Sequence, residues 1–132
     1  MPASPPLCTE AEITALVHQF YARIRVHEDL GPIFNGHIDD WPEHLDRLCD
    51  FWSSVLLGSG RFSGAPMPKH VALPGLKAEL FHQWLALWRS TAAEQPNQRL
   101  AEQAVAAAER IAQSLWMGYQ AYAQGVAVPR AL

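Results

Sequence analysis

The residues with the clearest chemistry are two histidines, His44 and His70, which stand on either side of a loop rich in glycine and proline. A neutral imidazole has a free nitrogen lone pair, so it can bind a metal ion or accept a hydrogen bond. Three aromatic residues, Phe81, Trp84 and Trp88, follow on or near the apolar face of a predicted helix. One histidine on a long helix, one on a short helix and a wall of aromatic rings suit a flat apolar cofactor held between helices.

His44 belongs to a helix predicted over residues 41–57, which begins at a capping box formed by Asp40 and Glu43. Helical geometry places His44 within about 40° of Leu48 and Phe51 around the helix axis. The imidazole therefore lies on the apolar face of this helix. For a lone histidine, a core residue bonded to a carbonyl or a boundary residue that reaches water is the simpler interpretation.

His70 follows a loop over residues 58–69 that contains three glycines and two prolines. Loops of this length inside compact domains are usually functional or disordered. We expect this one to be anchored by Phe62 and Met67. Proline residues open and close the segment around His70, which predicts a helix of two turns at most. Apolar neighbours favour the neutral imidazole that a metal requires, although a buried structural histidine remains the alternative.

Tyr21 lies inside the apolar face of a helix predicted over residues 9–26, which begins with a capping box of Thr9 and Glu12. A phenol that faces a core needs a partner for its hydroxyl group. From the sequence alone a backbone carbonyl is the favoured partner, and a ligand in a pocket is the alternative. Trp84 poses the same choice, because its indole N–H is only a donor and either packs in the core or holds an electron-rich ligand atom.

The other elements are also helices or turns. Residues 29–34 are expected to form a short turn, because Pro32 stops a helix that enters from before it and Asn35-Gly36 is a turn signal. Two further helices are predicted over residues 76–91 and 100–122, and the alanines of the last helix permit close packing. No segment alternates with a period of two, so the sequence predicts an all-α single domain.

Composition excludes several classes of protein. The chain of 132 residues is long enough for one domain, and a net charge of -3 without a basic cluster argues against nucleic acid and anionic membranes as partners. No apolar run approaches the length of a membrane span. The first eight residues lack the features of a signal peptide, which makes the cytoplasm the expected location.

The two cysteines and the chain ends give weaker signals. Cys8 and Cys49 have neither a metal-binding nor a redox-motif spacing, and no C-x-x-C-H motif for covalent haem attachment occurs. The expected domain covers residues 9–124. It is flanked by a flexible N-terminal tail over residues 1–8 and a C-terminal tail over residues 125–132.

Taken together, these residues resemble the truncated (two-over-two) haemoglobins, most closely their third group. The resemblance covers about residues 9 to 122, and the Gly-Gly pairs that the first two groups use at helix junctions are absent. Each matched motif position carries the residue type of the family. The specific parts are F-Y (20–21), D-L-G-P-I-F (29–34), W-x-x-H (41–44), F-W-x-x-x-L-L-G (51–58), F-x-G-x-P-M-x-K-H-x-x-L-P (62–74) and F-x-x-W-L-x-L-W (81–88).

The resemblance implies a globin-like helical sandwich around haem b, with His70 as the proximal ligand of the iron. It implies that Tyr21 and Trp84 donate hydrogen bonds to bound O₂ on the distal side. His44 would complete that side, either as a gate or as a third donor. The resemblance also implies the other residues around the haem, which are apolar walls from Phe51, Val55, Met67 and Phe81, and Lys69 and Arg61 as candidates that hold the propionates.

The function implied is binding of O₂, NO, CO or similar small ligands. A distal side crowded with donors favours retention of O₂ over transport, which points to redox chemistry: oxidation of nitric oxide as in a dioxygenase, peroxidase-like chemistry, or ligand sensing. The chain has no flavin or nicotinamide motif, so turnover needs an external electron donor. Whether the protein is an enzyme stays open at this point, because fold and ligand do not settle the task.

Two other interpretations are kept. In the first, the aromatic stripes are only a core and the protein is a helical interaction module. In the second, His37, His44 and Asp40 form a non-haem metal site, which their spacing disfavours. The remaining histidines are expected to be solvated surface residues, namely His18, His27, His37 and His82.

Overall fold

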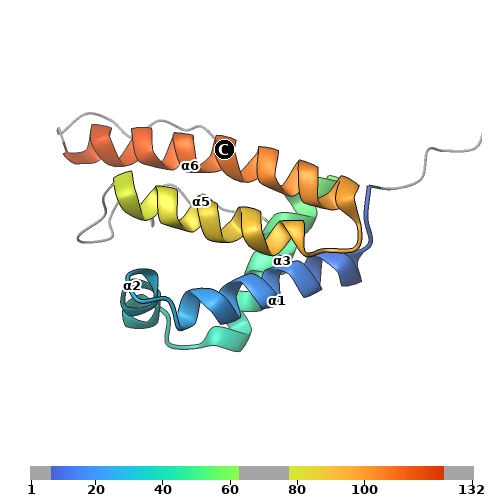
Figure 1. Ribbon diagram of the computed structural model, residues 1–132, viewed down its shortest axis with the longest axis horizontal. Coiled ribbons are helices and arrows are strands. Elements are labelled where there is room, and N and C mark those ends of the chain that lie inside the picture. Colours follow the sequence, from blue (N-terminus) through green and yellow to red (C-terminus); the bar gives the residue numbers. More distant parts are fainter. Residues whose placement is uncertain (1–6, 63–77, 124–132) are drawn as a thin grey trace, which may run out of the picture.

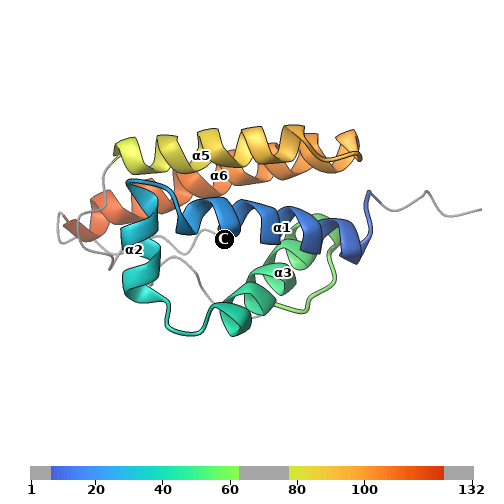
Figure 2. The same ribbon diagram turned by 60° about the horizontal axis from the view of Figure 1, so that its bottom comes forward.

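The computed structural model of the protein describes residues 7–62 and 78–123, and these residues form helices joined by turns, with no strand among them. The helices α1 and α3 make one layer, and α5 and α6 run side by side as the second layer, with α2 at one end (Figures 1 and 2). The predicted all-α, two-layer fold is confirmed. The bounds are α1 (Glu10–Arg25), α2 (Leu30–His37), α3 (Trp41–Leu57), α5 (Ala78–Ala93) and α6 (Gln98–Ala123).

Helix α1 begins at the predicted capping box. The hydroxyl oxygen of Thr9 accepts a hydrogen bond from the backbone N–H of Glu12 at 3.1 Å, and the Glu12 carboxylate accepts one from the backbone N–H of Thr9 at 2.8 Å. The burial of six side chains fixes the face that α1 turns to the core. These side chains are those of Ile13, Leu16, Val17, Phe20, Tyr21 and Ile24.

Helix α2 stands where the sequence predicted only a short turn, so that prediction was wrong. Pro32 lies in the first turn of α2, where a missing N–H breaks no helical hydrogen bond. The helix start is held by His27, whose Nδ1 accepts hydrogen bonds from the backbone N–H groups of Asp29 and Leu30, both at 3.1 Å. His27 is therefore a half-buried capping residue and not the solvated residue that we expected.

Gly31 is the position where α2 touches α1. A β-carbon at this buried glycine would stand 2.9 Å from the backbone oxygen of Arg25 and 3.2 Å from that of Ile24. Both atoms belong to the last turn of α1, so they can move only together with that helix. The close approach therefore depends on a residue without a side chain.

The variant Gly31→Ala is expected to lower the free energy of unfolding by about 1–3 kcal/mol, the usual cost of overpacking. The matched control is Gly36→Ala in the same helix, where an added β-carbon meets nothing within 4 Å. That control is expected to gain roughly 0.5–1 kcal/mol from helix propensity. Urea denaturation of both variants measures the difference, and equal midpoints would show that α1 and α2 are not in close contact at Gly31.

Helix α3 begins and ends at predicted signals. The Asp40 carboxylate accepts a hydrogen bond from the backbone N–H of Glu43 at 3.1 Å. The second hydrogen bond of the predicted capping box, from the backbone N–H of Asp40 to the Glu43 carboxylate, is not formed. The Glu43 carboxylate instead accepts a hydrogen bond from the Arg47 guanidinium, one turn later, at 3.0 Å. Gly58 ends the helix in the left-handed conformation with a φ of 65°, and its N–H donates to the oxygen of Ser54.

Helices α5 and α6 form a close antiparallel pair. The turn between them ends at Asn97, whose side-chain oxygen accepts a hydrogen bond from the backbone N–H of Leu100 at 3.1 Å. The expectation that small residues line the contact is confirmed, and the indole N–H of Trp88 donates to the backbone oxygen of Ala104 at 3.1 Å. The buried alanines of α6 are Ala101, Ala104, Ala107, Ala108 and Ala112.

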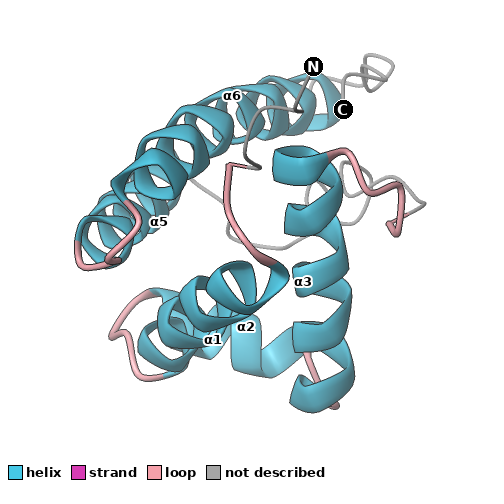
Figure 3. Ribbon diagram, turned by 90° about the vertical axis from the view of Figure 1, so that its right-hand side faces the viewer, coloured by secondary structure: helices cyan, strands magenta, loops and turns pink. Residues whose placement is uncertain are grey.

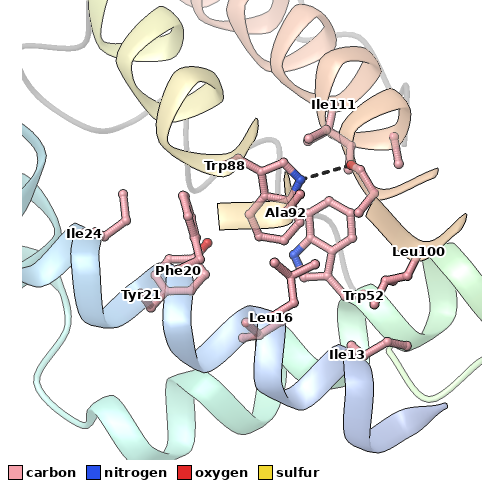
Figure 4. Close-up of a cluster of buried hydrophobic side chains, with 14 of the residues drawn as sticks. Ile13, Leu16, Phe20, Tyr21, Ile24, Trp52, Trp88, Ala92, Leu100 and Ile111 are labelled. Atoms are coloured by element: carbon pink, nitrogen blue, oxygen red, sulfur yellow. Dashed lines mark hydrogen bonds between the residues drawn. The ribbon is translucent and has the colours of Figure 1, made fainter. Parts of the chain in front are cut away.

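Figure 3 shows the pair of α5 and α6 lying across from α1 and α3, and Figure 4 shows the buried apolar side chains that pack between these two layers. Cys8, which the sequence analysis assigned to a tail, is only 4% exposed and belongs to this core. The backbone oxygen of the preceding Leu7 accepts a hydrogen bond from the Asn97 side chain at 3.0 Å. Residues 7 and 8 thus pack with the helices, and residues 1–6 lie outside the described part of the chain.

Candidate functional site

The structure describes seven of the ten predicted site residues. His70, Met67 and Lys69, together with the short helix expected around them, lie outside the described residues, so their roles remain predictions. The described seven come from α1, α3, α5 and the turn after α3, and they are Tyr21, His44, Phe51, Val55, Arg61, Phe81 and Trp84.

Tyr21 and Trp84 meet across the interface of the two layers. Tyr21 is 5% exposed, and its hydroxyl group is hydrogen-bonded to the indole side chain of Trp84. Because the indole N–H is only a donor, the phenol oxygen accepts this bond and keeps its own hydrogen available for another acceptor. Neither partner that we considered for Tyr21, a backbone carbonyl or a ligand, accounts for this contact.

Burial raises the pKa of Tyr21 well above its ordinary value of 10, and the hydrogen bond from Trp84 offsets only part of that rise. A raised pKa means that the neutral phenol is the form favoured in the folded protein. Tyr21 therefore stays a hydrogen-bond donor throughout the physiological range. Stability that depends on the neutral phenol is fully present below pH 10 and is lost as the pH rises above that value.

His44 lies on the side of Tyr21 that faces α3. Its ring stands edge-on to the Tyr21 ring at a centroid distance of 6.4 Å and edge-on to the Trp41 ring at 5.8 Å. The side chain is half-buried, so it lies between the aromatic cluster and the solvent. The structure thus brings together Tyr21, His44 and Trp84, the three residues assigned to the distal side.

Trp41 and its partners support this cluster, although no sequence pattern marks them as a group. The Trp41 indole N–H donates to the side-chain oxygen of Asn35 at 3.2 Å, and the Asn35 amide donates to the backbone oxygen of Arg25 at 3.0 Å. The Arg25 guanidinium lies 4.7 Å from the centre of the Trp41 ring. Asn35-Gly36 was interpreted as a turn signal, which concealed the role of Asn35 in joining α1, α2 and α3.

The predicted apolar walls lie on α3 and α5. Phe51 is half-buried against Phe62 at a centroid distance of 5.2 Å, and Phe81 is half-buried against Trp116 at 5.5 Å. Val55 is an apolar residue of α3 whose side chain is 40% exposed. The described residues thus leave apolar surface on α3 and α5 only partly covered, and this surface suits a flat apolar group.

Arg61 was a candidate for holding a propionate. Its guanidinium forms ion pairs with Glu10 at 2.7 Å and with Asp50 at 3.2 Å, which joins the start of α1 to α3. The same Glu10 carboxylate accepts a hydrogen bond of 2.5 Å from the buried hydroxyl of Ser53. Arg61 therefore has carboxylate partners of its own, and its contact with a propionate stays a prediction.

The non-haem metal site is not formed. Within residues 7–62 and 78–123, no group of three or more His, Cys, Asp and Glu side chains is placed to hold a metal ion. His37 is exposed, whereas His44 lies against aromatic rings.

No helix within the described ranges is both long enough and apolar enough to span a membrane.

Comparison with known proteins identifies the family. The chain is 38% identical over 86 residues to the group 3 truncated hemoglobin ctb of Campylobacter jejuni, a match that covers 62% of this chain and 68% of the relative. The chain belongs to the group 3 truncated haemoglobins. The crystal structure of a group III truncated hemoglobin from the same organism matches this truncated haemoglobin with a TM-score of 0.77 and 33% identity.

That structural match covers 87% of this truncated haemoglobin and 92% of the crystallised chain. No protein-family model matches the sequence. The relative and the crystal structure nevertheless confirm the resemblance drawn from the motifs, and they confirm the fold that it implied. The globin fold of this family binds haem and small gaseous ligands.

Proposed function

We propose that this truncated haemoglobin binds haem b through His70 and holds O₂, NO or a similar diatomic ligand beneath Tyr21 and Trp84. The observation that carries the proposal is the hydrogen-bonded pair of Tyr21 and Trp84 between the two layers, in which Tyr21 is buried and Trp84 is half-buried. His44 stands beside Tyr21, where it either gates the pocket or donates a hydrogen bond to the ligand.

The described residues fit a haem group. Its two faces are apolar, and the partly covered surfaces of α3 and α5 carry Phe51, Val55 and Phe81. Once bound, haem supplies an iron that takes diatomic ligands and exchanges electrons. The side chains around it exclude water and set the polarity of the pocket. Met67 would complete the wall, and Lys69 and Arg61 are the proposed partners of the propionates.

The donors on the distal side favour redox chemistry over transport. A diatomic ligand that gains negative charge on binding is stabilised by fixed N–H and O–H groups in a site without water. Tyr21 remains protonated because its pKa is raised, and the Trp84 indole is a donor at every pH. Such a site slows ligand release, whereas transport requires ready release. We therefore propose oxidation of nitric oxide by O₂, or peroxide reduction, as the reaction.

Several parts of this proposal rest on the sequence. An external electron donor is required, since the chain carries no motif for a nicotinamide or a flavin. The cytoplasm is the proposed location, and the proposed domain extends the predicted range of residues 9–124 to include residues 7 and 8, which pack with the helices.

The decisive test is the absorption spectrum of the purified protein in three states: ferric, reduced, and reduced with carbon monoxide. We expect a Soret band whose position shifts on carbon monoxide binding, as it does for haem with one histidine ligand. A colourless protein that takes up no added haemin would contradict the proposal. In that case the helical interaction module would be the better interpretation.

A further inference from the structure

Three tryptophan side chains form one stack that begins at the proposed ligand pocket. The Trp84 and Trp88 rings are parallel within 2° at a centroid distance of 5.8 Å. The Trp88 and Trp52 rings follow at 4.5 Å and 17°, and their contact joins α5 to α3 (Figure 4). The stack thus runs from the partner of Tyr21 into the centre of the protein.

The interior of this stack is dry. Trp88 is 0% exposed and Trp52 is 2% exposed, whereas Trp84 is half-buried. Phe20 of α1 stands edge-on to both Trp84 and Trp88, at centroid distances of 5.4 and 4.8 Å, and covers them on the side that faces α1. Packing alone would bury these rings in many orientations, but here two successive ring pairs are nearly parallel, at centroid distances typical of offset-stacked aromatic rings.

An indole is among the side chains that lose an electron most readily, and the resulting hole is a cation. The face of a neighbouring indole attracts a cation, most strongly where water is absent. Trp88 has an indole on each side, and its N–H donates to the backbone oxygen of Ala104 at 3.1 Å. That hydrogen bond becomes charge-assisted when the ring is oxidised. Burial of a charge is costly, so the hole is transient, and Trp88 is the ring best placed to hold it.

We propose that Trp84, Trp88 and Trp52 form a one-electron relay that supplies the haem pocket during reduction of a hydroperoxide. This inference rests on the proposed function, because it requires haem next to Trp84. Over a complete turnover the O–O bond of ROOH breaks, and two electrons and two protons convert it to ROH and water. Bound haem would supply one of these electrons, and the indole stack would supply the other. An external one-electron donor later returns both.

The first test does not require haem. A photoexcited ruthenium tris-bipyridine complex with an electron-accepting quencher oxidises the full-length protein, and transient absorption follows the indole radical. We expect a long-lived radical in the unmodified protein. In Trp88→Phe, which removes the central ring, we expect its lifetime to fall about tenfold because the cation loses its flanking indole faces. The matched control is Trp116→Phe, which replaces a half-buried tryptophan outside the stack.

If Trp88→Phe does not fold, Trp52→Phe serves instead, since it removes the terminal ring and leaves the other contact in place. A lifetime equal to that of the unmodified protein in whichever of these variants folds would overturn the relay. A shortened lifetime in Trp116→Phe to the same extent would also overturn it, because the effect would then not be specific to the stack.

The second test uses the haem-loaded protein and hydrogen peroxide without a reductant. Electron paramagnetic resonance is expected to show an organic radical whose hyperfine splitting changes when tryptophan is ring-deuterated and is unaffected by deuterated tyrosine. In Trp88→Phe we expect most of this tryptophan signal to disappear. A haem-binding protein whose radical lies on tyrosine, or is unchanged in Trp88→Phe, would overturn the relay and leave the proposed function intact. A protein without haem would refute the proposed function and, with it, the peroxide reaction.

Discussion

The variant His70→Ala is expected to lose most of its affinity for haem. The apolar walls would remain, but the bond between the iron and the imidazole would be lost. Removing even an outer partner of a metal ligand typically costs about 10–100-fold in affinity, so loss of the ligand itself should cost at least roughly 100-fold. Haemin titration of the apoprotein, followed at the Soret band, measures the change.

His44→Ala is the matched control for His70→Ala. His44 is half-buried beside Tyr21, on the side assigned to the gaseous ligand, so its removal should leave haem affinity within a few-fold of the unmodified protein. Added imidazole should restore the spectrum of His70→Ala, because it can occupy the space left by the missing ring. If His44→Ala loses haem and His70→Ala does not, the two sides of the site are reversed. If neither variant changes colour or fold, the helical interaction module gains support.

Most of the fold was predictable because the regular spacing of apolar residues reveals helices with long apolar faces. Helices α1 and α3 begin at the predicted caps, Thr9 and Asp40. Helix α2 was missed because proline and Asn-Gly signals within eight residues outweighed its short apolar pattern. Its formation depends on contacts beyond its own sequence, namely the His27 cap and the close approach of Gly31 to α1.

The candidate site was predictable as a set of residues but not as a set of contacts. Motifs named Tyr21, His44 and Trp84, yet no periodicity shows that Tyr21 accepts a hydrogen bond from a residue on α5. The same limit applies to the stack of Trp88 on Trp52, since ring orientation depends on how two distant helices pack. Sequence patterns give the face on which a side chain lies, whereas partners across the core follow only from the assembled layers.

The variant Tyr21→Phe is expected to release O₂ about 10–100-fold faster. A hydrogen bond to a charged group contributes about 1.5–3 kcal/mol, and each 1.4 kcal/mol corresponds to a factor of about ten in the rate. Autoxidation should also become faster, since the retained ring excludes water but no longer donates. Haem content should be unchanged. Stopped-flow displacement of O₂ by carbon monoxide measures the rate, and an unchanged rate would remove Tyr21 from the distal side.

The size of the effect depends on what Trp84 does when Tyr21 no longer accepts its hydrogen bond. An indole N–H that is left without its acceptor in a partly buried site is destabilised, so it is expected to turn toward the ligand and compensate in part. The double variant Tyr21→Phe/Trp84→Phe separates the two contributions. We expect its dissociation rate to exceed the product of the single effects, because each residue alone substitutes partly for the other. If the fold-change in the double variant equals the product of the two single fold-changes, the donors act independently. The hydrogen bond between Tyr21 and Trp84 would then serve only to hold α1 against α5.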